Sequence, residues 1–154
     1  MKPVTKWSNF ELAEPRLAGL VRARFEGHPH HVLGTVRRDG SPRLSGINVF
    51  INEGRLWFGS MPAARKADDI FRDPRVSLYS APLREDMSGG DASISGKAIP
   101  LSADIAHTWR PENPADGVYF EVEIDRVHLV EVVDDELVVS MWDNQRGVRI
   151  VKRQ

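Results

Sequence analysis

The sequence predicts a mainly β protein, a small barrel of antiparallel strands with two or three short helices. Six or seven apolar segments of strand length are separated by turn signals, and helical spacing is confined to short stretches. Hairpin turns, rather than helical crossovers, join neighbouring strands. A chain of 154 residues suits one domain with a real core, so we treat residues 1–154 as a single domain.

Composition narrows the class of protein. Hydrophobic residues make up 41% and charged residues 28% of the chain, and the net charge is −1, which argues against a general nucleic-acid or membrane surface. The absence of cysteine excludes disulfides, thiolate metal sites and thiol nucleophiles. The first residues lack the apolar core of a signal peptide, and no apolar run is long enough to cross a bilayer, so we expect a cytoplasmic protein.

The first half of the chain predicts one helix and a strand meander. Glu14-Pro15 is a helix start, and Gly27 can end that helix. Strands over 31–38 and 42–51 flank the hairpin turn Asp39-Gly40. The turn at 52–54 then leads to a further strand. The apolar residues at helical spacing in the first helix are Leu17, Leu20, Val21 and Phe25.

A second helix is predicted to begin near Ala63, to pack Ala67, Ile70 and Phe71 inward, and to end at Asp73-Pro74. A third, short helix is expected after Ser102. Breaker-rich loops are expected over 82–90 and 109–117. The predicted strands of this half cover 55–59, 75–80, 91–100, 118–133, 136–141 and 147–151, and Asp134-Asp135 is expected to form the hairpin turn that leads into 136–141.

The start of the second helix carries an electrostatic anomaly. Arg65 and Lys66 lie in the first turn, where unpaired N–H groups already supply about half a unit of positive charge. A bound anion would make this arrangement favourable, which predicts a phosphate site beside Ser60. The alternative is a solvated surface on which Asp68 and Asp69 offset the two cations.

Other candidate residues are less specific. His28, His30 and His31 are close in sequence, but adjacent strand residues point to opposite faces, so we expect no metal site and a polar turn instead. Trp57 fits the core. Trp142, followed by several arginines, fits either a cap over a planar anionic ligand or a solvated basic tail. Motifs for a serine nucleophile, a Rossmann fold and a P-loop are missing, and no catalytic residue is identified.

Five segments in a fixed order resemble one known family. The chain is similar to the split β-barrel flavin and deazaflavin proteins related to pyridoxamine 5′-phosphate oxidase, roughly over residues 30–100. No single segment is specific, whereas the order of all five is. The segments are Asp39-Gly40-Ser41-Pro42, the strand with Arg43, Leu56-Trp57-Phe58-Gly59-Ser60, Ala64-Arg65-Lys66 and Asp73-Pro74-Arg75-Val76-Ser77-Leu78.

The resemblance implies a split β-barrel of the FMN-binding type, forming a homodimer with FMN, or the deazaflavin F420, at its interface. Arg43 and Lys66 match phosphate-binding positions, and Trp142 is similar to a tryptophan that reaches the flavin from the partner subunit. Residues 44–48 match the strand that lies along the flavin ring. The cofactor-binding residues implied in this way are Arg43, Leu44, Ser45, Gly46, Ile47, Asn48, Gly59, Ser60, Arg65, Lys66 and Trp142.

The implied activity is hydride transfer between FMN and a small substrate. An F420-dependent reductase is the first alternative. A non-catalytic flavin- or haem-binding protein, with one of the three clustered histidines as the haem ligand, is the second, and a structural dimer without ligand is the third. Residues 149–153 lack the acid of the oxidase substrate signature, and Asn48 replaces its usual lysine, so we do not expect vitamin B6 oxidation. The substrate pocket is expected from loops 81–91 and 109–117 and the C-terminus.

Overall fold

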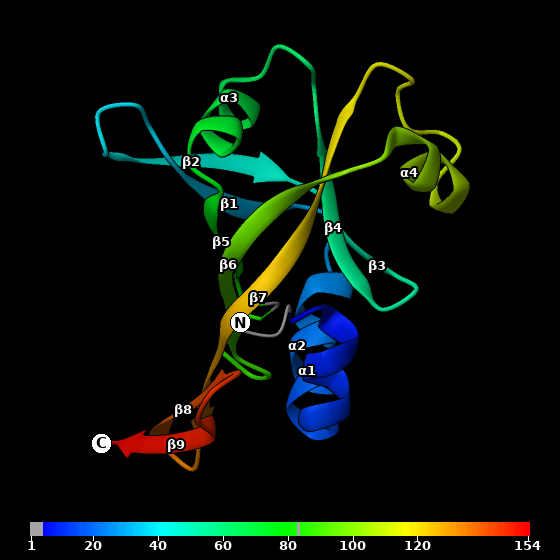
Figure 1. Ribbon diagram of the computed structural model, residues 1–154. Helices are drawn as coiled ribbons and strands as arrows, with labels where there is room; N and C mark the ends of the chain where they lie inside the picture. The colour runs from blue at the N-terminus through cyan, green and yellow to red at the C-terminus, as the bar shows by residue number, and fades with distance from the viewer. Residues whose placement is uncertain (1–4, 83) are drawn as a thin grey trace.

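The computed structural model describes residues 5–82 and 84–154 and confirms a mainly β protein. Over these residues it has nine antiparallel strands in one sheet and four helices (Figure 1). None of these helices is long and apolar enough to cross a membrane. The helices are α1 (Trp7–Ala13), α2 (Pro15–Glu26), α3 (Arg65–Arg72) and α4 (Ala103–Trp109). The strands are β1 (His31–Val36), β2 (Pro42–Ile47), β3 (Val49–Asn52), β4 (Arg55–Ser60), β5 (Arg75–Ser80), β6 (Asp91–Leu101), β7 (Val118–Val133), β8 (Glu136–Asp143) and β9 (Gly147–Arg153).

The strand order makes the sheet a split barrel. Neighbouring strands follow the order β2-β1-β5-β6-β7-β4-β3, so β2 and β3 lie at opposite ends of the hydrogen-bonded path. In the chain, however, only Asn48 separates these two strands. The sheet therefore curls until its two ends meet at this residue. The long strand β7 also carries β8 and β9, which extend away from the barrel at the lower left of Figure 1.

One large apolar cluster fills the space between the strands and the first two helices. Trp7 and Phe10 of α1 are fully buried, and Phe10 packs on Trp142 of β8 with ring centroids 4.9 Å apart. Helix α2 buries Val21 and Phe25 in the same cluster. The sequence did not predict α1, because a helix of seven residues is too short for a clear period. Helix α2 itself was predicted with its ends at Pro15 and Gly27, and both are confirmed.

The predicted turns are confirmed by their backbone conformation. Gly40 has φ +87° in the hairpin between β1 and β2, a value at which other residues are strained. Asp134 and Asp135 have φ +50° and +64° and form the tight turn between β7 and β8. The strand predicted over 42–51 is instead interrupted at Asn48, because the chain passes there from one end of the sheet to the other.

The prediction that Phe71 packs inward is wrong. Ala67 and Ile70 of α3 are buried as expected, whereas Phe71 is 60% exposed. Successive helical residues are about 100° apart around the axis, so Phe71 lies at the margin of the face that Ile70 buries. Its ring still packs on the buried Phe120, with ring centroids 5.4 Å apart.

Gly96 lies at an irregularity in the pairing of β6 with β7, where the register shifts between Ser95 and Gly96. A Cβ atom at Gly96 would lie 1.8 Å from the carbonyl oxygen of Glu123, far closer than any real contact. The two backbones can therefore approach this closely only because residue 96 has no side chain.

We predict that Gly96→Ala destabilises the protein by about 1–3 kcal/mol, because the β7 backbone must move to admit the methyl group. The matched control is Gly19→Ala in α2, where no atom lies within 4 Å of the new Cβ. There alanine should stabilise the helix by about 0.5–1 kcal/mol. Urea unfolding of both variants measures the difference, and equal stabilities would contradict the packing described for β6 and β7.

Candidate functional site

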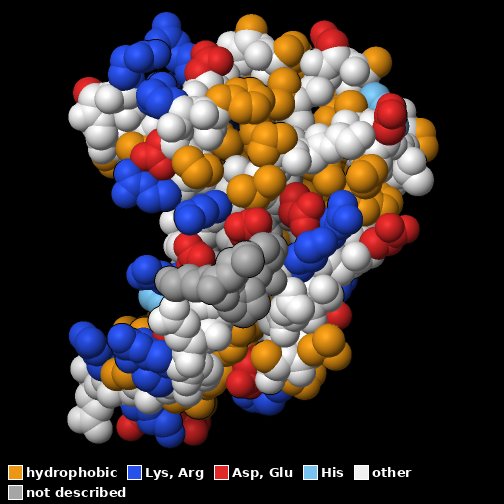
Figure 2. Space-filling view, viewed as in Figure 1, with side chains coloured by type: hydrophobic (Ala, Val, Ile, Leu, Met, Phe, Trp, Pro, Cys, Tyr) orange, Lys and Arg blue, Asp and Glu red, His pale blue; other side chains and the backbone are white. Residues whose placement is uncertain are grey.

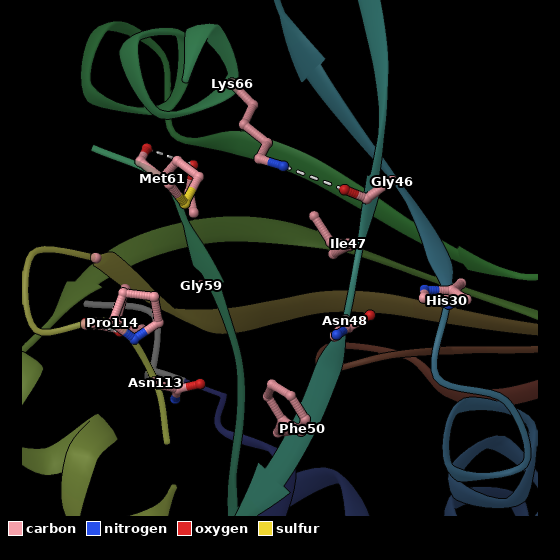
Figure 3. A pocket seen from close by; sticks show the side chains of 13 residues that line it. His30, Gly46, Ile47, Asn48, Phe50, Gly59, Met61, Lys66, Asn113 and Pro114 are labelled. Carbon is pink, nitrogen blue, oxygen red and sulfur yellow. Dashed lines mark hydrogen bonds between the residues drawn. The ribbon is translucent and has the colours of Figure 1, made fainter. Parts of the chain in front are cut away.

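A cavity of about 480 Å³ opens between the free edge of β2, the end of β4, the start of α3 and the loop that precedes β7 (Figure 3). Six of the eleven predicted cofactor residues line it: Gly46, Ile47, Asn48, Gly59, Ser60 and Lys66. Seven further lining residues were not predicted: His30, Phe50, Met61, Asn113, Pro114, Gly117 and Tyr119. We call this space the first cavity.

Lys66 reaches across the first cavity from the first turn of α3 to β2. Its ammonium Nζ donates a hydrogen bond to the carbonyl oxygen of Gly46 at 3.2 Å, as the dashed line in Figure 3 shows. Partial burial lowers the pKa of Lys66 below its ordinary value. Among the described residues that line the cavity, Lys66 is the only lysine or arginine. An ammonium carries three donors, so two remain for an anion.

The strand β2 offers an open backbone edge to this cavity. Because β1 is the strand that pairs with β2 among the described residues, alternate residues of β2 direct their polar backbone groups away from the sheet. Gly46 is one of them, since its carbonyl oxygen meets Lys66. Apart from its two chain neighbours, no atom of the residues that the structure describes lies within 4 Å of where a Cβ at Gly46 would stand. A flat molecule can therefore lie against this backbone.

Tyr119 forms part of the cavity wall opposite β2 and holds the loop beside it in place. Its hydroxyl donates a hydrogen bond of 2.6 Å to the carbonyl oxygen of Pro114, and the Nε2 atom of His107 lies 3.1 Å from the same oxygen. Burial, with a smaller contribution from the charge of Asp116, raises the pKa of Tyr119, so the hydroxyl keeps its proton near neutral pH. A Cβ at Gly59 would lie 2.9 Å from the Tyr119 ring, so the small residue makes room for it.

A buried carboxylate joins α3 to the sheet beside the cavity. Asp69 is 3% exposed and accepts hydrogen bonds from Thr35 of β1 at 2.8 Å, Arg43 of β2 at 2.7 Å and Arg72 of α3 at 3.0 Å. Burial alone would raise the pKa of Asp69. The hydrogen bonds from Arg43, Thr35 and Arg72, together with the charge of Arg43, outweigh burial and lower the pKa to about 2.

The other predicted residues lie outside the first cavity. Arg43 is half-buried and is held by Asp69 through a 2.7 Å ion pair. Leu44 is 76% exposed on the outer face of β2, and Ser45, half-buried, is its neighbour on that strand. Arg65 is exposed at the first position of α3. Within one chain the structure therefore brings Lys66 together with residues 46–48 of the predicted strand, but not with Leu44, Ser45 or the two arginines.

Trp142 lies in a different place. It is 5% exposed and forms part of the wall of a second cavity of about 420 Å³ on β6, β7 and β8. Burial and the charges of Arg126 and Arg149 lower the pKa of His128 there. The basic residues that line this second cavity are Lys97, Arg126, His128, Arg146 and Arg149.

The three clustered histidines have separate environments. His31 is buried and its Nε2 atom lies 2.7 Å from the carbonyl oxygen of Phe25, while the Nδ1 atom of His28 accepts a hydrogen bond from the backbone N–H of His30. Only His30 lines the first cavity. Within the described ranges, the structure holds no group of three or more histidine or acidic side chains that could bind a metal ion.

The unpredicted lining residues carry weak sequence signals. Phe50 and Tyr119 lie in apolar strands and are therefore read as core, and His30 is read as part of a turn. The loop 109–117 was expected to contribute to a substrate pocket, and Asn113, Pro114 and Gly117 of that loop do line the cavity. Gly117 stands two residues before Tyr119, and this spacing gives no indication in the sequence that both residues line one cavity.

Comparison with known proteins agrees with this architecture. A family model described as pyridoxamine 5′-phosphate oxidase matches residues 17–131. No curated protein matches the sequence. PhzG from Burkholderia lata 383, solved in complex with tetrahydrophenazine-1-carboxylic acid, has a TM-score of 0.70 and 16% identity, and the alignment covers 96% of this chain and 93% of PhzG.

Two further solved structures are similar. A pyridoxamine 5′-phosphate oxidase-related, FMN binding protein from Nostoc punctiforme PCC 73102 has a TM-score of 0.62 at 13% identity, over 91% of this chain and 96% of its own. An F420 reductase has a TM-score of 0.53 at 19% identity, over 68% of this chain and 94% of its own. At these identities the three structures establish the fold alone.

We predict that the Asp69 network stabilises the protein above about pH 4 and that this contribution is lost as the pH falls toward 2. The pKa of Asp69 is lower in the folded protein than in the unfolded chain, so the carboxylate favours folding only while it is ionised. Urea unfolding between pH 6 and pH 2 should show a steeper loss of stability for the wild type than for Asp69→Asn. Parallel pH dependences would contradict the assignment.

Proposed function

Because the chain belongs to the pyridoxamine 5′-phosphate oxidase family, we propose that it binds FMN in the first cavity and acts as a flavin-dependent oxidoreductase. The observation that carries this proposal is the position of Lys66. It presents a partly buried ammonium at the first turn of a helix, inside a cavity whose other described lining residues include no lysine or arginine. Helix N–H groups and a cation at one point favour a phosphate group.

The residues present fit FMN. Lys66, the first-turn N–H groups of α3 and the Ser60 hydroxyl, which donates to the Met61 carbonyl oxygen at 3.1 Å, form the polar end that would hold the phosphate. The open β2 backbone at Gly46 and the apolar side chains of Ile47 and Phe50 would receive the flat ring. When bound, FMN would supply the hydride-transfer chemistry.

The protein's own residues would bind and orient FMN and would exclude water from the cavity. Gly46 keeps the strand surface flat, and Tyr119 holds the loop at Pro114 against the cavity. Asn48 and Asn113 add neutral amides beside the apolar wall, and these fix orientation without adding charge. No acid or base from the protein is assigned to the reaction.

The charge of the first cavity favours FMN over F420. The F420 reductase among the similar structures shares the fold, and F420 carries an acidic tail that extra cations would have to balance. The described lining residues supply a single ammonium, that of Lys66, which suits one phosphate group. Fluorescence titration measures the affinity of the protein for each cofactor, and tighter binding of F420 than of FMN would contradict the assignment of FMN.

A non-catalytic binding protein is the second candidate, and it would use the same cavity. Of the three clustered histidines, only His30 lines this space, whereas His31 is buried against Phe25. His30 would therefore be the haem ligand. A Soret band after addition of haem, lost in His30→Ala, would favour this candidate over an oxidoreductase.

We propose further that the chain forms a homodimer, as the resemblance implies. Three large apolar side chains on the elements that border the cavity are strongly exposed: Leu44 on β2 at 76%, Met61 just after β4 at 63% and Phe71 on α3 at 60%. Figure 2 shows hydrophobic side chains gathered in the upper half of the molecule, between α3 and α4. A second copy would cover this surface.

We predict that Lys66→Ala weakens FMN binding by about 1–3 kcal/mol, because a charge-assisted hydrogen bond to the phosphate is lost. Riboflavin, which has no phosphate, should bind the variant and the wild type alike. Quenching of flavin fluorescence measures both affinities. Lys97→Ala, which removes a cation from the second cavity, is the control. An unchanged FMN affinity in Lys66→Ala would remove this residue from the site.

We predict that the protein sediments at twice the 17.3 kDa mass of the chain and that Leu44→Asp shifts it toward the monomer. A carboxylate placed in an apolar interface is strongly unfavourable. Sedimentation equilibrium measures the mass. Leu12→Asp is the matched control, because Leu12 is 83% exposed on α1 and lies outside this surface. A wild-type monomer would overturn the dimer proposal.

A further inference from the structure

The carboxylate of Asp69 stands where β1, β2 and α3 meet, yet it does not line the first cavity. We propose that Asp69 is a positioning residue for the phosphate end of that cavity, acting through α3 and β2 without touching the ligand. This inference rests on the proposed function, since it concerns how the same site obtains its geometry. It assigns to Asp69 a role in ligand selection beyond its contribution to stability.

The contacts of Asp69 are fully committed to the protein. Thr35 and Arg43 lie directly opposite each other in the pairing of β1 with β2, and both donate to the Oδ2 atom of Asp69. Arg72 donates to the Oδ1 atom and also to the carbonyl oxygen of Val36 on β1. Both oxygens are therefore occupied, and the carboxylate ties the helix to two strands at once.

Lys66 depends on the same attachment. It precedes Asp69 by three residues, so the two side chains leave the same side of α3. Asp69 meets Arg43 on β2, and Lys66 meets Gly46, three residues further along that strand. The helix thus contacts β2 at two points in opposite chain order. If the Asp69 contact is lost, α3 can shift on β2, and the ammonium and the first-turn N–H groups move with it.

Charge and position predict opposite results for the same substitution. Asp69→Asn removes a negative charge near the proposed phosphate, so simple electrostatics would strengthen FMN binding. The positioning role predicts weaker binding, because the amide carries no charge and leaves one acceptor oxygen for the three donors Thr35, Arg43 and Arg72, which weakens the attachment of the helix. Asp68 is the matched control, since it is the adjacent residue, is exposed and carries the same charge.

The experiment compares FMN with riboflavin in the wild type, Asp69→Asn and Asp68→Asn. Only FMN carries the phosphate, so the ratio of the two dissociation constants reports the phosphate end of the site. In Asp69→Asn we expect this preference for FMN to fall on the order of tenfold. In Asp68→Asn it should stay unchanged or rise slightly. A preference in Asp69→Asn that equals or exceeds that of the wild type overturns the proposal.

Thr35→Val provides a milder variant in case Asp69→Asn does not fold. It removes one of the three donors to Asp69 and leaves both arginines in place. The preference for FMN should then fall about severalfold, by the loss of one hydrogen bond. A wild-type preference in a folded Thr35→Val protein, with Asp69→Asn unfolded, would reduce Asp69 to a structural residue and overturn the proposal.

Hydrogen exchange without any flavin separates this inference from the proposed function. The amides of 65–72 should exchange faster in Asp69→Asn and in Thr35→Val than in the wild type or Asp68→Asn. If the wild type binds no flavin, the proposed function fails, and the exchange of α3 alone decides whether Asp69 anchors the helix. Equal protection of α3 in all four proteins overturns the anchoring step on which the positioning role depends.

Discussion

The closure of the sheet at Asn48 determines where the free edge of β2 and the first cavity lie. Because β2 and β3 lie at opposite ends of the hydrogen-bonded order and are separated by one residue, the sheet must bend round on itself. The closure leaves one edge of β2 without a strand neighbour. That free edge, at Gly46, forms the wall of the first cavity, so the candidate site is a direct consequence of the barrel topology.

The cations on α3 and β2 differ in how they are paired. The Asp69 carboxylate pairs with both Arg43 and Arg72, so among the described lining residues Lys66 is the cation that faces the cavity. The two cations at the start of α3 therefore differ in role. Lys66 turns inward to β2, whereas Arg65 stays in solvent. The anomaly visible in the sequence is resolved for Lys66 by the free backbone edge and, in our proposal, by a phosphate group.

Local signals in the sequence predicted much of the fold. Asp39-Gly40 and Asp134-Asp135 are turn pairs whose backbone preferences act over a few residues, and both were located correctly. Helix α1 has too few residues to show a period, and the exposure of Phe71 depends on how α3 is rotated on the sheet. Both features arise from packing against distant segments, which a single sequence does not reveal.

The site was predictable to the extent that it lies on contiguous segments. The run 46–48 and the pair Gly59-Ser60 line the cavity because neighbouring residues of one strand share an edge. Asn113 and Tyr119 come from a segment far away in the chain, and the partnership of Arg43 with Asp69 depends on how α3 lies on β2. Sequence reasoning could assign Arg43 a charge, but not the buried carboxylate that holds it.

The most direct test of FMN binding in the first cavity is an NMR titration of the isotope-labelled protein with FMN, following backbone amides and the Lys66 ammonium. We predict that the largest shifts occur at Gly46, Ile47 and Lys66, with little change in the second cavity around His128. Saturable shifts at these residues would locate the cofactor between β2 and α3. Shifts confined to the second cavity, or none at saturating FMN, would contradict the binding of FMN in the first cavity.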